Sequence, residues 1–83
     1  MTQRRIVYVI RSRKDATRHY IGRTADLPSR LASHNAGESL QTRNFAPWGL
    51  VVSVQFASEE LATRFERFLK SGTGHTFAKQ YFE

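Results

Sequence analysis

The chain has 83 residues, a net charge of +6 at neutral pH and no cysteine. This length allows one small domain, and we expect residues 1–83 to form it. The lack of cysteine excludes disulfide bonds and thiolate metal sites, and no apolar run approaches the roughly 20 residues of a transmembrane helix. The polar first residues show no signal peptide, so the cytoplasm is the expected location.

Arginine supplies most of the positive charge, with ten Arg and three Lys against seven acidic residues. The planar guanidinium binds phosphate oxygens in pairs and stacks on bases, whereas the Lys ammonium acts as a point charge. A small Arg-rich domain of this kind favours a nucleic-acid partner. Two alternatives stay open. The charge could serve only solubility, or it could bind an anionic membrane surface, although the sequence has no strongly basic amphipathic helix.

The first half of the chain predicts a β-hairpin followed by a helix. Residues 6–10 are β-branched and aromatic, which is typical of a buried strand, and residues 18–23 form a second strand after a polar turn. Asp26 is a good N-cap residue, Pro28 suits a first helical turn, and Gly37 is a natural stop. A helix is therefore expected between Asp26 and Gly37.

The second half predicts a strand and two helices after an irregular loop at residues 38–47. Residues 48–56 alternate as in a half-buried strand, with Leu50 and Val52 on the same face. Ser58 caps the next helix, and the Gly-rich stretch 71–74 ends that helix as a turn. A short third helix is expected at 75–82. The residues of this helix expected to pack inward are Phe77, Ala78, Tyr81 and Phe82. The whole order predicts an α+β domain with a three-stranded sheet.

Few acidic residues are available for chemistry, because most of them have a predicted local task in a turn, a cap or a helix start. Only Glu38 and Glu66 lack such a task, and Glu66 lies in mid-helix beside the apolar stripe. A single acid argues against glycoside hydrolysis and against a two-metal cluster, but it allows one Mg²⁺ that keeps several waters. The alternative for Glu66 is an exposed ion pair with Lys70, four residues later.

Two further pairs have open interpretations. Arg30 and His34 share one helical face, where they could hold a phosphate and move a proton, or could be a solvated Arg and a half-buried His. Tyr8 and Tyr20 lie in adjacent predicted strands, either as core residues with a solvated hydroxyl or as functional phenols.

The order of these residues resembles the GIY-YIG endonuclease superfamily, and in particular a small stand-alone bacterial-type member. Tyr20-Ile21-Gly22 matches the second tripeptide of the family name, and Ile6-Val7-Tyr8 matches the first with Ile in place of Gly. Further landmarks follow in the family order, and they are Arg30, Leu31, His34, Gly37, Thr42, Pro47, Trp48, Glu66 and Lys70.

The resemblance implies a three-stranded antiparallel sheet flanked by helices and hydrolysis of phosphodiester bonds in DNA with one divalent metal ion, Mg²⁺ or Mn²⁺. By matching positions, Glu66 would hold the metal and Arg30 would stabilise charge on the phosphate. Tyr8 would activate the attacking water, with Tyr20 and His34 assisting through hydrogen bonds. The residues expected to contact DNA are Arg23, Arg43, Lys70, His75 and Lys79.

We therefore expect a metal-dependent DNA endonuclease that is structure-specific and acts in DNA repair or recombination. The alternative is a module of the same fold that binds nucleic acid without cleaving it, and a third interpretation is an interaction domain whose charge is incidental. Larger members of the family choose targets through an attached DNA-binding domain. Here either a partner protein or the basic surface of the domain itself would have that task.

Overall fold

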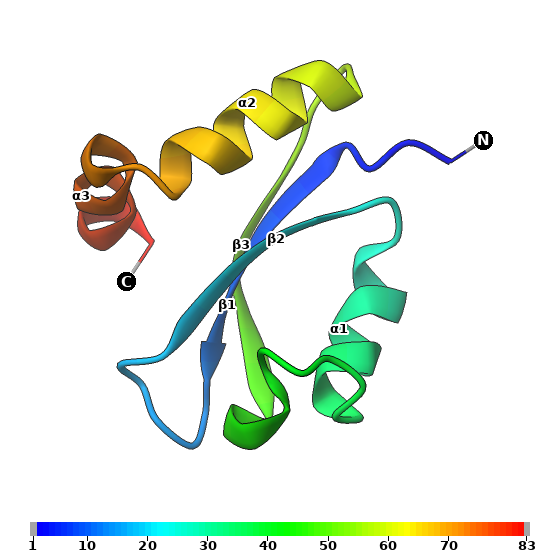
Figure 1. Cartoon of the computed structure of the whole chain (residues 1–83), viewed down its shortest axis with the longest axis vertical. Helices are drawn as coiled ribbons and strands as arrows, with labels where there is room; N and C mark the ends of the chain where they lie inside the picture. The colour runs from blue at the N-terminus through cyan, green and yellow to red at the C-terminus, as the bar shows by residue number, and fades with distance from the viewer. Residues whose placement is uncertain (1, 83) are drawn as a thin grey trace.

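The computed structural model describes residues 2–82 (Figure 1). Its elements, in chain order, are β1 (Ile6–Ser12), β2 (His19–Thr24), α1 (Leu27–Asn35), the 3₁₀ helix η1 (Arg43–Phe45), β3 (Trp48–Gln55), α2 (Glu59–Leu69) and α3 (Gly72–Tyr81). The strands form one antiparallel sheet in the order β2-β1-β3. This arrangement confirms the predicted α+β class and the three-stranded antiparallel sheet. Within residues 2–82, no helix has the length and apolar composition needed to cross a membrane.

The central strand β1 builds the core on both faces of the sheet, because successive side chains of a strand point to opposite sides. Val7 and Val9 face α2 and α3, where they pack with Leu69. Tyr8 and Ile10 point to the other face, which α1 and η1 cover. The two groups of helices accordingly lie on opposite sides of the sheet (Figure 1). Tyr8 is thus fixed by a backbone that is hydrogen-bonded to a strand on each side.

Helix α1 begins and ends at the predicted signals. The Asp26 carboxylate accepts a hydrogen bond from the Ser29 N–H at 3.2 Å, and Pro28 occupies the first turn. Gly37 follows the end of the helix with φ of +79°, a conformation that glycine adopts without steric cost. These local signals fix the position of the helix that carries Arg30 and His34.

Helix α3 begins at Gly72, so the prediction of a turn over 71–74 and a helix from residue 75 was wrong. The Ser71 hydroxyl accepts a hydrogen bond from the Gly74 N–H at 3.2 Å and caps the helix. A Cβ at Gly74 would overlap the Phe68 carbonyl, so this glycine serves close helix packing rather than a turn. Tyr81, expected to pack inward, is 64% exposed.

Strand β3 follows the predicted alternation from Val52 onward, but not at Leu50 and Val51. Its register with β1 pairs Val9 with Val52 and Ile10 with Leu50, and this irregularity leaves out Val51. Val51 and Val52 are consequently both half-buried, whereas Leu50 is 45% exposed. The alternating pattern therefore predicted the strand and the facing of its second half correctly, but the facing of Leu50 and Val51 was wrong because the register shifts between them and Val52.

Candidate active site

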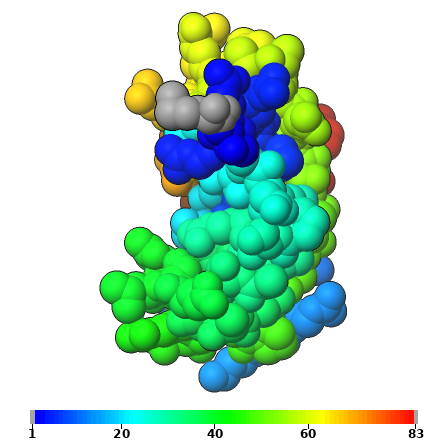
Figure 2. Space-filling model, turned by 90° about the vertical axis from the view of Figure 1, so that its right-hand side faces the viewer, coloured from blue at the N-terminus to red at the C-terminus, as the bar shows by residue number. Residues whose placement is uncertain are grey.

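Three of the four predicted catalytic residues and the predicted metal ligand line one cavity with a volume of 340 Å³, and the fourth catalytic residue, His34, is buried behind it. Tyr8 comes from β1, Tyr20 from β2, Arg30 from α1 and Glu66 from α2. The remaining lining residues are Arg4, Gly22, Arg23 and Thr24. We call this space the Tyr8 cavity. The N-terminal segment, to which Arg4 belongs, lies between the start of α2 and the region of α1 (Figure 2).

Gly22 is the residue that lets both tyrosines approach the cavity. A Cβ at this position would overlap the Tyr8 hydroxyl oxygen and lie 2.9 Å from Cε2 of Tyr20. Gly22 is also the direct partner of Tyr8 across the two strands. The glycine of the second tripeptide therefore leaves room for the aromatic side chains around the site.

Behind the cavity, a buried chain of hydrogen bonds runs from Tyr8 to His34 and on to Thr42. The Tyr8 Oη lies 2.8 Å from His34 Nε2, and His34 Nδ1 lies 2.7 Å from the Thr42 Oγ1. His34 and Thr42 are both completely buried, and Tyr8 is 1% exposed. Arg30 Nε–H donates to the Tyr8 oxygen at 3.3 Å. The consistent assignment has the Tyr8 O–H donating to Nε2 and the Nδ1–H donating to Thr42.

Burial keeps the two members of this chain that can titrate uncharged. It raises the pKa of the Tyr8 phenol above its ordinary value, and the hydrogen bond and charge of Arg30 offset this only in part. It lowers the pKa of His34, and the positive charge of Arg30 lowers it further. The resting state is therefore a neutral phenol hydrogen-bonded to a neutral imidazole, with the Arg30 guanidinium beside them.

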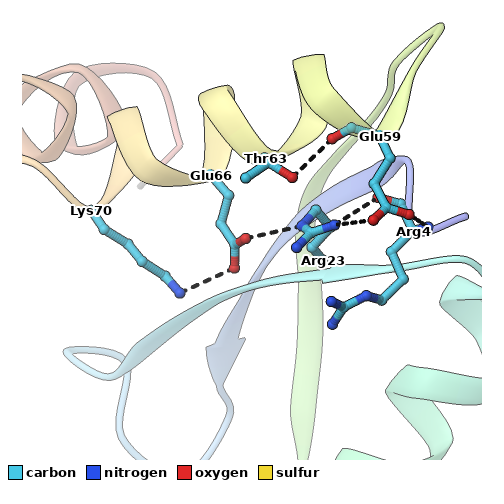
Figure 3. Close-up of polar contacts among 6 residues, drawn as sticks. All are labelled: Arg4, Arg23, Glu59, Thr63, Glu66 and Lys70. Atoms are coloured by element: carbon cyan, nitrogen blue, oxygen red, sulfur yellow. Dashed lines mark hydrogen bonds and ion pairs between the residues drawn. The ribbon is translucent and has the colours of Figure 1, made fainter.

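Glu66 reaches from α2 toward β2 between two cations (Figure 3). Its Oε1 accepts from Arg23 Nε at 3.1 Å, and its Oε2 accepts from Lys70 Nζ at 3.1 Å. Burial alone would raise the pKa of Glu66, but the hydrogen bonds from Lys70 and Arg23 outweigh burial and lower it. The pair with Lys70 considered above thus exists, but the carboxylate also lines the cavity and contacts a strand residue.

The Tyr8 cavity fits one divalent ion held by one carboxylate. Glu66 is the only acidic residue among the described residues that line it, and its lowered pKa keeps it ionised at neutral pH. Mg²⁺ commonly binds through one or two carboxylates while its other positions go to water and phosphate oxygens. Across residues 2–82, no three His, Asp or Glu side chains gather into a metal-binding group. The fit is therefore to a single ion, which would compete with Arg23 and Lys70 for the oxygens of Glu66.

The residues predicted to contact DNA are spread over the molecule. Arg23 lines the Tyr8 cavity, whereas Lys70 and His75 line a second cavity on the other side of Tyr20. Arg43 in η1 and Lys79 in α3 are exposed and line neither cavity. η1 and α3 lie on opposite faces of the sheet (Figure 1).

Sequence reasoning did not assign two residues that the structure brings to the site. Thr42 served only as a landmark of the resemblance, yet it contacts His34 from a loop eight positions later. Arg4 lines the cavity, but nothing distinguished it from Arg5 in the sequence. The motif order was the signal that could have found Thr42, and no sequence signal indicated Arg4.

Comparison with known proteins adds independent information. The model of the GIY-YIG catalytic domain, which describes a nuclease-type family, matches residues 4–80. A UPF0213 protein from Streptococcus pneumoniae serotype 4 (strain ATCC BAA-334 / TIGR4) is 38% identical over 71 residues, covering 84% of this chain and 70% of that protein. No solved structure matches. With the domain model matched from the start of β1 to the last turn of α3, the chain belongs to the GIY-YIG family.

Proposed function

We propose that the protein is a metal-dependent DNA endonuclease that hydrolyses phosphodiester bonds. The observation that carries this proposal is the meeting of Tyr8, Arg30 and Glu66 in one cavity, although they are far apart in the sequence. We further propose that it cuts DNA of particular structure in repair or recombination, in the cytoplasm. Its net charge of +6 supports DNA as the partner.

Arg30 is the group proposed to neutralise the phosphate in the transition state. Charge develops there on the non-bridging oxygens, and a cation fixed beforehand stabilises it without reorganisation. The guanidinium carries five N–H donors, so its contact with the Tyr8 oxygen leaves others for phosphate oxygens. A divalent ion held by Glu66 would add positive charge at the phosphate and make a bound water more acidic.

Tyr8 is the proposed acceptor of the proton from the attacking water. As the water attacks phosphorus, its proton moves to the Tyr8 oxygen, and the hydroxyl proton of Tyr8 moves to His34 Nε2. The P–O bond to the leaving strand breaks, and the released alkoxide takes a proton from solvent water. The 2.8 Å contact between Tyr8 and His34 supports this path. The imidazolium that forms keeps its Nδ1–H bond to Thr42. The relay lets a phenol with a raised pKa act as a base, because the phenol passes on one proton as it takes another.

The test is incubation of the protein with Mg²⁺ or Mn²⁺ and a panel of duplex, flap and junction DNAs. We expect metal-dependent cleavage of at least one of these DNAs, and loss of most of it in the Glu66→Gln, Arg30→Ala and Tyr8→Phe variants. Arg64→Ala is the control for lost charge, because Arg64 is exposed on α2 and does not line the cavity. Absence of cleavage by the wild type, or equal cleavage by Glu66→Gln, would refute the proposal.

A second candidate is a module that binds nucleic acid without cutting it. One observation favours it. Both carboxylate oxygens of Glu66 already accept hydrogen bonds from cations, so neither is free to bind a metal ion. This candidate predicts salt-sensitive DNA binding that does not change when EDTA removes metal. Metal-dependent scission would exclude it.

A further inference from the structure

A second cavity, of 440 Å³, lies beside the Tyr8 cavity along β2. We call it the His75 cavity. The turn before β2 contributes Thr17 and Arg18 to its walls, and α3 contributes His75 and Ala78. Tyr20 lines both cavities. An ion pair also connects the two cavities. Lys70 lines the His75 cavity, and its partner Glu66 lines the Tyr8 cavity.

The lining of the His75 cavity combines an apolar floor with a cationic rim. The apolar side chains are Val9, Ile21, Leu69, Ala78 and Phe82. Lys70 and His75 supply basic groups, and no acidic residue among the described residues lines it. Arg18 also borders the cavity, but its guanidinium lies over the Phe45 ring and pairs with Asp15 at 3.7 Å. A site of this size and composition suits a flat, mostly apolar group that carries negative charge at one end. A nucleotide has this chemistry, since the base is planar and the phosphate is anionic.

We propose that the His75 cavity holds the base of one unpaired nucleotide next to the phosphate in the Tyr8 cavity. In a paired duplex the bases are stacked inside, and only a base that has left the stack can enter a protein cavity. Phe82 offers a ring for stacking, which tolerates any base. The proposal rests on the proposed function and narrows its substrate to DNA with an unpaired nucleotide at the cut.

Binding of a fluorescent base tests this proposal without relying on cleavage. The probe is a duplex with one unpaired 2-aminopurine nucleotide, and the reference is the same duplex with 2-aminopurine paired. Both are titrated with wild-type protein in EDTA. We expect a change in fluorescence and tighter binding only for the unpaired probe. His75→Glu and Ala78→Leu should weaken that binding by on the order of tenfold, the scale of one lost stacking contact.

Gln80→Glu is the matched control for the charge change, because Gln80 is exposed on the same helix and does not line the cavity. It should bind the unpaired probe as the wild type does. His75 is also exposed, so its variant is expected to fold even if Ala78→Leu does not. Equal affinity for the two probes, or equal loss in His75→Glu and Gln80→Glu, would overturn the proposal.

Cleavage assays separate the failure of this inference from the failure of the proposed function. If the wild type cuts both DNAs equally and His75→Glu does the same, the endonuclease proposal stands and the nucleotide cavity is refuted. If the unpaired probe binds selectively but no DNA is cut with Mg²⁺ or Mn²⁺, the cavity stands and the proposed cleavage is refuted.

Discussion

Adding one methyl group at Gly22 should disturb both the stability and the site. The new Cβ would lie 2.6 Å from Cζ of Tyr8 and 2.9 Å from Cε2 of Tyr20, against the 3.5–4.0 Å at which carbon atoms pack best. The Tyr8 ring would have to move by about 1 Å to relieve the overlap. Tyr8 is 1% exposed and its hydroxyl is held by His34 at 2.8 Å. The movement would therefore break a buried hydrogen bond.

The expected cost follows from these two effects. Overpacking a core costs about 1–3 kcal/mol, and loss of a buried hydrogen bond adds about 1 kcal/mol. Gly22→Ala should thus lower the free energy of unfolding by about 2–4 kcal/mol. At a position where alanine fits without strain, the same substitution raises the free energy of unfolding by about 0.4–1 kcal/mol. In a domain of this size the melting temperature should fall by at least about 8 °C.

The assay is urea unfolding, followed by the fluorescence of the single Trp48. Gly72→Ala is the matched control, because a Cβ at Gly72 meets nothing within 4 Å and alanine favours helix. The double variant Tyr8→Phe/Gly22→Ala removes the hydroxyl oxygen that the Cβ overlaps, so its cost should be smaller than the sum of the two single costs. An unfolding midpoint for Gly22→Ala equal to that of the wild type would refute the reasoning.

Three other predictions use the same residues and surfaces. Burial holds the pKa of His34 below its ordinary value of about 6.5. Below about pH 6.5 the unfolded chain therefore binds more protons than the folded chain. The free energy of unfolding should decrease there by at most about 1.4 kcal/mol for each pH unit. Urea unfolding between pH 7.5 and 5.5 checks this slope, which His34→Gln should reduce. Arg23→Gln removes the guanidinium that donates to Oε1 of Glu66, and it should tighten Mn²⁺ binding about fivefold or more, as measured by calorimetry. An unchanged affinity would show that Arg23 and the metal ion do not compete for Glu66. If Arg43 and Lys79 contact DNA, replacing either by Ala should lower the slope of log affinity against log salt by about 1, without changing the cleavage rate at saturating DNA.

The parts of the fold predicted from the sequence are those fixed by local chemistry. Asp26 and Gly37 mark the two ends of α1 because a cap and a positive φ depend on the residue itself. The start of α3 was wrong because Gly72 and Gly74 favour turns in isolation. The close packing of Gly74 against Phe68 of α2 is a tertiary contact that no local pattern reveals.

The same distinction between local sequence signals and tertiary contacts applies to the candidate site. The motif order indicated Tyr8, Arg30 and Glu66 as a set, and the structure brings them to one cavity. The contact between Arg23 and Glu66 joins residues 43 positions apart, and its geometry depends on how α2 crosses β2. Periodicity describes which face of an element a residue occupies, but it does not say which other element will lie opposite.

The position of Tyr8 in the central strand has a consequence for turnover. Its backbone is paired with β2 and β3 at the same time, and its side chain is closed in behind by a buried histidine. A group anchored in this way has no hinge. If Tyr8 acts as proposed, product departure must come from motion of the nucleic acid and not from withdrawal of the phenol. In that case, substitutions that speed the release of product are expected on the protein surface. Substitutions next to Tyr8 would lower both the stability of the fold and the rate of cleavage.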